Sequence, residues 1–303
     1  METADNPLLL CVVGPTACGK TRLAAKLAYI LNGEIISADS RQVYRDMSIG
    51  TGKDLEEYVI DSVSIPYHLI DIKNAGEKYN IYEYKRDFKK VYKDIVKRDK
   101  LPILCGGSGL YIESVLNNYR LDYVPINRGF RQKCTALSME ELTEMLQQKK
   151  KLHNTTDTTD RERLIRALEI ALYNEQYPAE AAMFSPNYKL FYIDAERECL
   201  RERIAQRLKH RLENGLIEEV KSLMEREINL SYYGLEYRFV SDYISEVLSY
   251  EEMVERLEIA IGQFAKRQQT WFNRMNRNGF ELIDIDVNMN DDEKVQFIIQ
   301  CCR

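Results

Sequence analysis

The residues best suited to chemistry form one glycine-rich segment near the start of the chain. The segment reads Gly14-Pro15-Thr16-Ala17-Cys18-Gly19-Lys20-Thr21. It fits the phosphate-loop pattern G-x-x-x-x-G-K-[ST], in which backbone N–H groups converge on phosphate oxygens at the start of a helix. Lys20 would add a mobile positive charge, and the Thr21 hydroxyl would bind a magnesium ion. We therefore expect all eight residues to bind a phosphate or pyrophosphate, unless the glycines merely turn the chain.

A carboxylate follows the next apolar run of the sequence. Asp39 ends the predicted strand Glu34–Asp39 and is followed by Ser40. In doubly wound sheets, ligands bind at the carboxyl ends of the strands, so Asp39 can face the same crevice as the phosphate loop. There it could act as a general base, bind magnesium indirectly or cap the next turn, since Asp and Ser favour capping positions in any case. The residues alone leave these three roles open.

The elements that must position these groups are short apolar runs separated by helical patterns. The predicted strands are Leu8–Val13, Glu34–Asp39, His68–Ile72, Leu101–Cys105, Lys189–Asp194 and Phe280–Ile285. Apolar residues at helical spacing predict helices at Thr21–Leu31, Asn80–Lys100, Glu196–Asn214, Leu216–Glu227 and Glu251–Met275. This alternation indicates an α/β fold with both faces of a parallel sheet covered. Together with the phosphate loop, it predicts a doubly wound, P-loop NTPase-like sheet.

The middle of the chain breaks this alternation. No strand pattern occurs between Leu121 and Pro186, whereas Ser138–Lys151 and Arg161–Asn174 have helical patterns on either side of the polar stretch Asn154–Asp160. We therefore expect a catalytic core formed by residues 1–120 and 187–303, interrupted by a helical insertion at 121–186.

Composition excludes several classes of protein. The 303 residues include 45% hydrophobic and 30% charged ones, which is typical of soluble globular proteins. The longest apolar run near the start is far too short to span a membrane, the first residues are acidic, and the seven cysteines show no disulfide or zinc spacing. These features predict a reduced, cytoplasmic protein that does not bind membranes. The net charge of −5 excludes nucleic-acid binding by bulk charge but allows a local basic groove.

Several other residues have competing interpretations. The strand Leu101–Cys105 ends in Gly106-Gly107-Ser108, so it lacks the metal-binding Asp that nucleoside triphosphatases usually carry there. Asp194 could replace that Asp or could start a helix. We expect His68 to be structural and Trp271 to be a core aromatic. The basic stretch Lys85–Lys100 is expected to be a solvated helix face.

Several segments together resemble the tRNA dimethylallyltransferases, the isopentenyl transferases that modify the adenosine next to the anticodon. The matching segments are Gly14–Thr21, Asp39-Ser40-Arg41-Gln42-Val43-Tyr44, Ile49–Lys53, Gly106–Tyr111, Asp160-x-x-Arg163-x-x-Arg166-Ala167-Leu168-Glu169 and Lys266-Arg267-Gln268-x-Thr270-Trp271-Phe272. They span most of the chain in one order. The phosphate loop is shared with many kinases, but the segments at Asp39 and Arg166 are far more specific.

The resemblance implies transfer of a dimethylallyl group from dimethylallyl diphosphate to N6 of that adenosine, with Mg²⁺ and the phosphate loop holding the diphosphate. It implies that Asp39 is the general base and that Lys20 and Thr21 act with it in catalysis. The implied tRNA contacts are Asp39, Ser40, Arg41, Gln42, Ser108, Arg131, Glu162, Arg163, Leu164, Ile165, Arg166 and Arg267. We expect a monomer.

The sequence departs from the family pattern at three places. Cys18 replaces the more usual Ser of the loop, the stretch Leu121–Thr159 is short, and Gly234-Leu235-Glu236-Tyr237-Arg238 differs from the common Gly-Tyr pattern. Two alternatives remain at this stage. A phosphate-loop kinase of a nucleotide or metabolite would share the loop and the sheet. An RNA-binding switch that depends on a nucleoside triphosphate would bind tRNA without modifying it.

Overall fold

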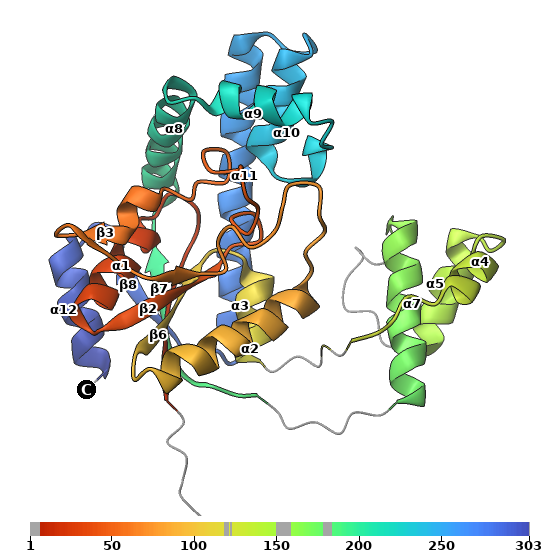
Figure 1. Ribbon diagram of the computed structural model, residues 1–303, viewed down its shortest axis with the longest axis horizontal. Coiled ribbons are helices and arrows are strands. Elements are labelled where there is room, and N and C mark those ends of the chain that lie inside the picture. Colours follow the sequence, from red (N-terminus) through yellow and green to blue (C-terminus); the bar gives the residue numbers. More distant parts are fainter. Residues whose placement is uncertain (1–6, 118–120, 122, 150–158, 178–183, 303) are drawn as a thin grey trace, which may run out of the picture. The chain divides into compact units, whose positions relative to one another are not determined.

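Six parallel strands form the central sheet of the computed structural model, in the order β5-β2-β6-β1-β7-β8 (Figure 1). The structure describes residues 7–117, 121, 123–149, 159–177 and 184–302. The strands are β1 (Leu8–Val13), β2 (Gly33–Ala38), β5 (Tyr67–His68), β6 (Leu101–Gly106), β7 (Asn187–Asp194) and β8 (Leu282–Asp286). The chain runs from β1 to β2 on one side and later adds β7 and β8 on the other. The predicted doubly wound parallel sheet is therefore confirmed.

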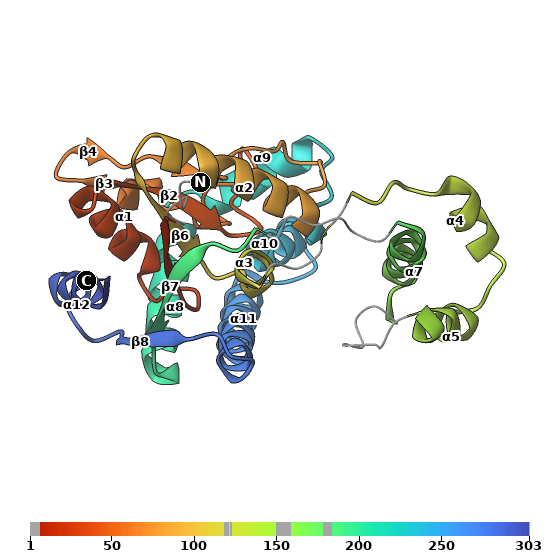
Figure 2. The ribbon, with the colours of Figure 1, turned by 90° about the horizontal axis from the view of Figure 1, so that it is seen from below.

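Helices pack on both faces of this sheet and on one another. They are α1 (Lys20–Ile30), α2 (Ile81–Lys97), α3 (Gly109–Leu116), α8 (Arg197–Glu213), α9 (Leu216–Glu225), α10 (Leu235–Ile244), α11 (Tyr250–Arg277) and α12 (Asp291–Cys302). Among them, α9 and α10 pack on other helices. Figure 2 shows α1 and α12 on one side of the sheet and α2, α3 and α11 on the other. Asn80 and Ser249 start α2 and α11 with capping boxes, each pairing with a Glu three residues later.

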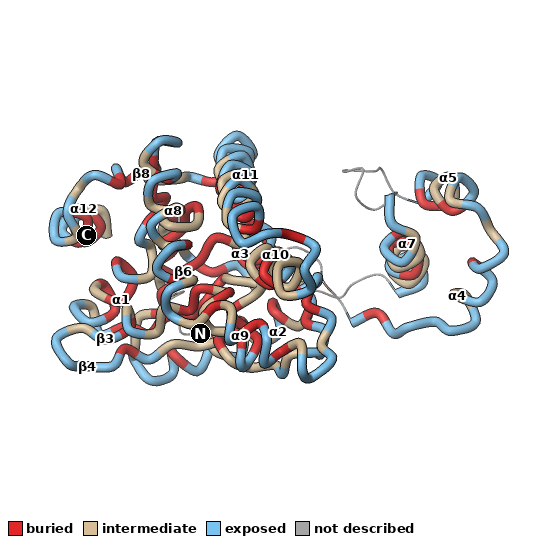
Figure 3. Tube along the Cα trace, turned by 90° about the horizontal axis from the view of Figure 1, so that it is seen from above, coloured by how far each residue is buried: buried red, intermediate tan, exposed pale blue. Residues whose placement is uncertain are grey.

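Buried residues lie along the strands and on the inner faces of the helices (Figure 3). Residues 9–13 of β1 are completely buried, because this strand pairs with β6 on one side and β7 on the other. Burying each such side chain stabilises the fold by about 1.5–3 kcal/mol. Among the described helices, none has the length and apolar character needed to cross a bilayer.

The structure differs from the sequence prediction in the segment around β5. The strand expected at His68–Ile72 ends at His68, because Leu69 and Asp71 have positive φ angles that leave the extended conformation. The segment before it forms a small hairpin, β3 (Val59–Ile60) and β4 (Val63–Ser64), which the sequence reading missed. Its turn residues Asp61 and Ser62 both have positive φ, as a two-residue hairpin loop requires.

The chain divides into two compact units, Met1–Tyr119 with Phe184–Arg303, and Arg120–Met183. The second unit contains α4 (Arg128–Cys134), α5 (Met139–Lys149) and α7 (Arg161–Gln176). Its small core consists of Cys134, Leu142, Leu146, Leu164, Ala167 and Leu168. The end of the helix predicted at Ser138–Lys151 and most of the polar stretch Asn154–Asp160 lie outside the described residues.

Candidate active site

A cavity of about 790 Å³ lies at the carboxyl ends of β1, β2 and β6 in the larger unit. The phosphate loop, the turn after β2 and the loop after β6 form one side of it. Residues from α8, α10 and α11 form the rest. Its volume is within the range of ordinary small-molecule sites.

The phosphate loop has the geometry of an anion cradle. Gly19, with φ +84°, directly precedes the first residue of α1, Lys20. Gly14 must be glycine, because a Cβ there would lie 2.9 Å from Sγ of the buried Cys18. Lys20 Nζ donates a hydrogen bond to the Pro15 carbonyl at 3.0 Å. Of the eight loop residues, those that line the cavity are Thr16, Ala17, Gly19, Lys20 and Thr21, whereas Gly14, Pro15 and Cys18 support the loop from outside it.

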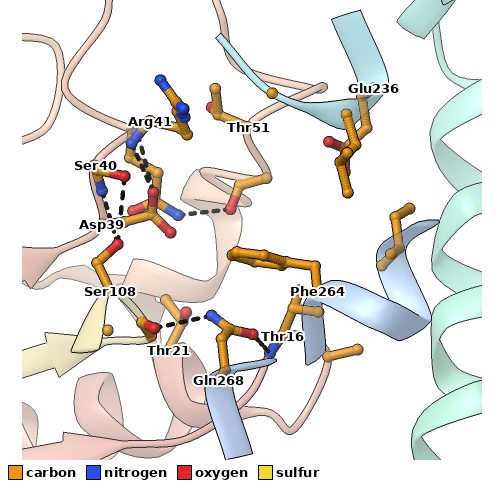
Figure 4. A pocket seen from close by; sticks show the side chains of 18 of the residues that line it. Thr16, Thr21, Asp39, Ser40, Arg41, Thr51, Ser108, Glu236, Phe264 and Gln268 are labelled. Carbon is orange, nitrogen blue, oxygen red and sulfur yellow. Dashed lines mark hydrogen bonds between the residues drawn. The ribbon is translucent and has the colours of Figure 1, made fainter. Parts of the chain in front are cut away.

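Asp39 has one of the three roles left open by the sequence, that of a cap, and it also lines the cavity. Its Oδ1 accepts hydrogen bonds from the amides of Arg41 at 2.8 Å and Gln42 at 3.4 Å, so it caps the turn. The same carboxylate lines the cavity that contains the phosphate loop. Within the described part of the chain, the second oxygen has no hydrogen-bond partner. Figure 4 shows Asp39 beside Ser40 and Ser108, on the side of the cavity opposite Glu236.

Of the arginine and glutamine side chains that follow Asp39, one faces the cavity and the other is buried and hydrogen-bonded. Arg41 lies 5.0 Å from the ring of Tyr232 and faces the cavity. The Gln42 side chain is buried and makes two hydrogen bonds. It donates to the Gly52 carbonyl at 2.8 Å and accepts from Ser37 Oγ at 3.1 Å. Gln42 therefore holds the loop at Gly52 in position.

Ser108 and Arg267 also line the cavity. Ser108 Oγ accepts a hydrogen bond from the Ser40 amide at 3.1 Å. The Arg267 guanidinium lies 5.8 Å from the ring of Phe264, which projects into the cavity in Figure 4. The larger unit thus brings together the phosphate loop and the expected tRNA contacts Asp39 to Gln42, Ser108 and Arg267.

The remaining expected tRNA contacts lie in the second unit. Glu162 and Arg163 are exposed in the first turn of α7, Ile165 is half-buried, and Leu164 is fully buried in the core of that unit. Arg131 and Arg166 both donate to the buried carboxylate of Glu169, at 2.8–2.9 Å. Burial by itself would raise the pKa of Glu169, but these two arginines lower it below its usual value.

The arginines that α8 presents to the cavity were not predicted from the sequence. Arg203, Arg207 and Arg211 are four residues apart and line it together. Arg207 donates to Thr16 Oγ1 at 3.1 Å and to Asp54 Oδ2 at 2.6 Å, which joins α8 to the phosphate loop. The four-residue spacing was a visible signal, because it puts three arginines on one helix face.

Two further polar residues at the cavity were also missed as site residues. Gln268 of α11 accepts from the Thr16 amide at 2.8 Å and donates to the Gly107 carbonyl at 2.9 Å. Glu236 of α10 lines the cavity and pairs with Arg211 at 3.2 Å. Burial raises the pKa of Glu236, although Arg211 opposes the shift. Gln268 lies within the family-like segment Lys266–Phe272 and Glu236 within the segment Gly234–Arg238, but neither segment indicates the partner, which is 252 residues away for Gln268 and 25 for Glu236.

The cavity is locally basic although the chain is acidic. Seven basic residues line it against four acidic ones: Lys20, Arg41, Arg203, Arg207, Arg211, Arg238 and Arg267 against Asp39, Asp54, Glu57 and Glu236. Burial, reinforced by the nearby Asp54, raises the pKa of Glu57. Such a surface favours anionic ligands.

Other residues singled out in the sequence have definite surroundings. His68 bonds to the buried Glu34 at 2.7 Å, consistent with a structural role. Asp194 is exposed at the end of β7 and does not line the cavity. Trp271 was expected in the core; it is half-buried and packs against the core, and it also lines the cavity, where the Arg274 guanidinium lies 4.0 Å from its ring. No cluster of three or more His, Cys, Asp or Glu suited to a metal occurs among the described residues.

The fold and the site define a phosphate-loop α/β protein in which an anion cradle and a carboxylate share one cavity. The IPP transferase family model matches residues 42–275, most of the chain. A tRNA dimethylallyltransferase 2 from Phocaeicola vulgatus is 50% identical over 303 residues, covering 99% of this chain and 98% of the relative. The chain therefore belongs to the IPP transferase family, which confirms the resemblance seen in the sequence.

Solved structures agree with this assignment. The tRNA isopentenylpyrophosphate transferase from Bacillus halodurans is 31% identical and superimposes with a TM-score of 0.72, over 98% of this chain and 96% of that one. A eukaryotic dimethylallyltransferase is 23% identical with a TM-score of 0.75, covering 92% of this chain and 74% of that one, and it shows the same fold.

Proposed function

We propose that this chain transfers a dimethylallyl group from dimethylallyl diphosphate to N6 of the adenosine next to the anticodon of tRNA. One observation carries the proposal: an anion cradle and the carboxylate of Asp39 line one cavity of about 790 Å³. The family and the curated relatives favour prenyl transfer over the alternative of a small-molecule kinase.

The phosphate loop and α8 would stabilise the leaving group. As the allylic C–O bond breaks, negative charge develops on the diphosphate oxygens and positive charge on carbon. Groups fixed in advance where that charge develops lower the barrier most effectively. Lys20, the loop amides and the Arg207 guanidinium, which already contacts Thr16, are suited to hold the diphosphate.

Asp39 would act on the nucleophile. The N6 amine loses a proton as it attacks carbon, and the carboxylate takes that proton while the new N–C bond forms. Because Oδ1 is already held by the amides of Arg41 and Gln42, Oδ2 is the oxygen left to accept it. The turn therefore fixes the base without consuming both of its oxygens.

The residues present fit a magnesium ion that arrives with the diphosphate. Mg²⁺ commonly binds through one or two protein groups together with phosphate oxygens and water. Thr21 and Asp39 line the same cavity, and a dedicated cluster of metal ligands is absent from the described residues. We assign Thr21 to this ion. When bound, the ion would neutralise charge on the departing diphosphate.

The acceptor would be a base turned out of an RNA loop, because proteins read such unstacked bases most readily. Arg41, Ser108 and Arg267 would contact the RNA at the cavity. Arg131 of α4 and Glu162, Arg163 and Arg166 of α7 would contact it from the second unit, with Leu164 and Ile165 supporting α7.

The direct test is incubation with unmodified tRNA and dimethylallyl diphosphate, followed by nucleoside mass analysis. We expect adenosine to gain one dimethylallyl unit, and we expect no such gain when ATP replaces the diphosphate. Phosphorylated small molecules formed from ATP would support the kinase instead. Binding of tRNA that depends on a nucleoside triphosphate and leaves every nucleoside mass unchanged would support the RNA-binding switch.

A further inference from the structure

Gln268 lies on the buried face of α11, among apolar residues that pack into the core. Ala265, Phe272 and Met275 on that face are buried, and the Gln268 side chain is only 8% exposed. A buried amide must have its hydrogen bonds satisfied, or it costs stability. Gln268 satisfies them with two backbone groups that belong to different loops of the cavity.

The amide of Gln268 fits closely between these loops. Its Oε1 accepts from the Thr16 amide at 2.8 Å, and its Nε2 donates to the Gly107 carbonyl at 2.9 Å (Figure 4). The fit depends on glycine, because a Cβ at Gly107 would lie 2.4 Å from Nε2. The side chain is therefore fixed at the edge of the phosphate loop.

These contacts reduce the number of hydrogen-bond donors that the phosphate loop can offer to an anion. Helix α1 begins at Lys20, so the donors at the helix N-terminus belong to the second half of the loop. Thr16 is in the first half and has two polar groups that could serve a longer phosphate chain. Gln268 takes its amide, and Arg207 donates to its hydroxyl at 3.1 Å.

We propose that Gln268 is a specificity-determining residue, which limits the phosphate loop to two phosphates and disfavours triphosphates. Its Oε1 already accepts from the Thr16 amide, so that amide is not free to donate to a third phosphate. The donors at the start of α1 remain available to a diphosphate. The inference rests on the proposed function in one respect, that the loop binds a diphosphate.

The test compares binding of inorganic pyrophosphate and inorganic tripolyphosphate, with magnesium, by calorimetry. Wild-type protein is expected to bind pyrophosphate more tightly. Gln268→Met keeps the length of the side chain but removes the acceptor and frees the Thr16 amide. We expect it to shift the ratio of the two dissociation constants toward tripolyphosphate by about 3- to 10-fold, the effect of one hydrogen bond.

Two matched variants separate the acceptor from the rest of the side chain. Gln268→Glu keeps an acceptor for Thr16 and adds negative charge, so the ratio should not move toward tripolyphosphate. Gln269→Met changes the neighbouring glutamine, which bonds to the Ala195 carbonyl outside the cavity, and should leave the ratio unchanged. Gln268→Ala serves as a second acceptor-free variant if Gln268→Met does not fold, as judged by its melting curve.

The outcomes are distinguishable. If both acceptor-free variants lose affinity for the two anions equally, so that the ratio stays constant, Gln268 is only structural and the inference is overturned. It is also overturned if the wild type binds tripolyphosphate at least as tightly as pyrophosphate. A wild type that binds neither anion and does not modify tRNA would overturn the proposed function as well, whereas a modifying enzyme with a constant ratio would overturn this inference alone.

Discussion

The amide of Ser40 donates a hydrogen bond to Oγ of Ser108 at 3.1 Å, joining the turn after β2 to the loop after β6. The Ser108 amide in turn donates to the carbonyl of Ala38. Asp39 lies between these two bonds in the sequence, so both of its neighbours are tied to the adjacent loop. The carboxylate proposed as the base is therefore flanked on both sides by residues that are hydrogen-bonded to Ser108.

Replacing Asp39 by Asn should separate catalysis from binding. The amide still accepts from the turn but cannot take the N6 proton, so we expect product formation to fall by about 10²–10⁴-fold. Affinities for pyrophosphate and tRNA should change little. Single-turnover formation of modified adenosine, measured beside both affinities, checks this expectation.

The matched control for that experiment is Asp94→Asn. Asp94 lies exposed on α2, pairs with Arg98 at 3.0 Å and does not line the cavity. Its activity should equal that of the wild type. An Asp39→Asn enzyme with wild-type turnover would remove Asp39 from the role of base.

Replacing Gly52 by Ala should disturb the arginines of α8. Gly52 has a φ of +62°, and a Cβ there would lie 1.8 Å from Arg211 Nη2 and 2.3 Å from Arg207 Nη2. Both guanidiniums must move, which takes Arg207 away from Thr16. We expect pyrophosphate affinity, measured by calorimetry, to fall about tenfold, as for the loss of one charge-assisted hydrogen bond.

Gly76→Ala controls for backbone strain, because Gly76 also has positive φ but no atom lies within 4 Å of a Cβ built there. That variant should lose about 1 kcal/mol of stability and keep its pyrophosphate affinity. Equal affinity losses in the two variants would mean that strain, and not displacement of the arginines, explains the effect.

Arg163 should bind RNA phosphate from the second unit. Its side chain is exposed. Its backbone amide donates to Asp160 at the start of α7, and this bond does not involve the guanidinium. Arg163→Gln should weaken tRNA binding and reduce the slope of log K against log salt concentration by about 1. Filter binding at several salt concentrations measures the slope. Arg201→Gln, an exposed change on α8, should leave it unaltered, and an unaltered slope for Arg163→Gln would exclude the contact.

Glu169 should make the stability of the second unit depend on pH. Because Arg131 and Arg166 lower its pKa, the carboxylate stabilises the folded chain above its unfolded pKa, and this contribution disappears as pH falls through the lowered folded value. Glu169→Gln should therefore cost about 1–3 kcal/mol at pH 7 and progressively less below about pH 4. Urea unfolding at several pH values measures the difference.

Glu175→Gln is the control for Glu169, since Glu175 lies on the same helix and makes only an exposed pair with Lys149. It should change stability by less than about 1 kcal/mol at every pH. A cost for Glu169→Gln that stays constant down to pH 3 would contradict the proposed contribution of its charge.

The sequence predicted the positions of those groups that are placed by their neighbours in the chain. The phosphate loop follows a buried run and starts a helix, so its place in the sheet could be read from neighbouring residues. Asp39 could be placed at a strand end for the same reason. What could not be read was its double use, because the hydrogen bonds to Arg41 and Gln42 depend on the shape of the turn.

Long-range partners were invisible in the sequence. Thr16 meets Gln268 across 252 residues and Arg207 across 191. No spacing rule relates such pairs, since the intervening helices decide which residues meet. The sequence placed Trp271 against the core but not at the cavity, because apolar character marks the inner face of α11 and that face covers both. The end of β5 was misjudged because residues other than glycine, such as Leu69, seldom adopt the left-handed backbone conformation with positive φ.

Gly106 pairs with Val13 on one side and Ala38 on the other, and a Cβ on it would lie 2.3 Å from the Ala38 carbonyl oxygen. Main-chain packing of three strand ends thus sets the separation between the phosphate loop and the turn that carries Asp39. Side chains around the cavity can change during evolution and alter which ligands enter. The separation between the loop and the turn would stay the same.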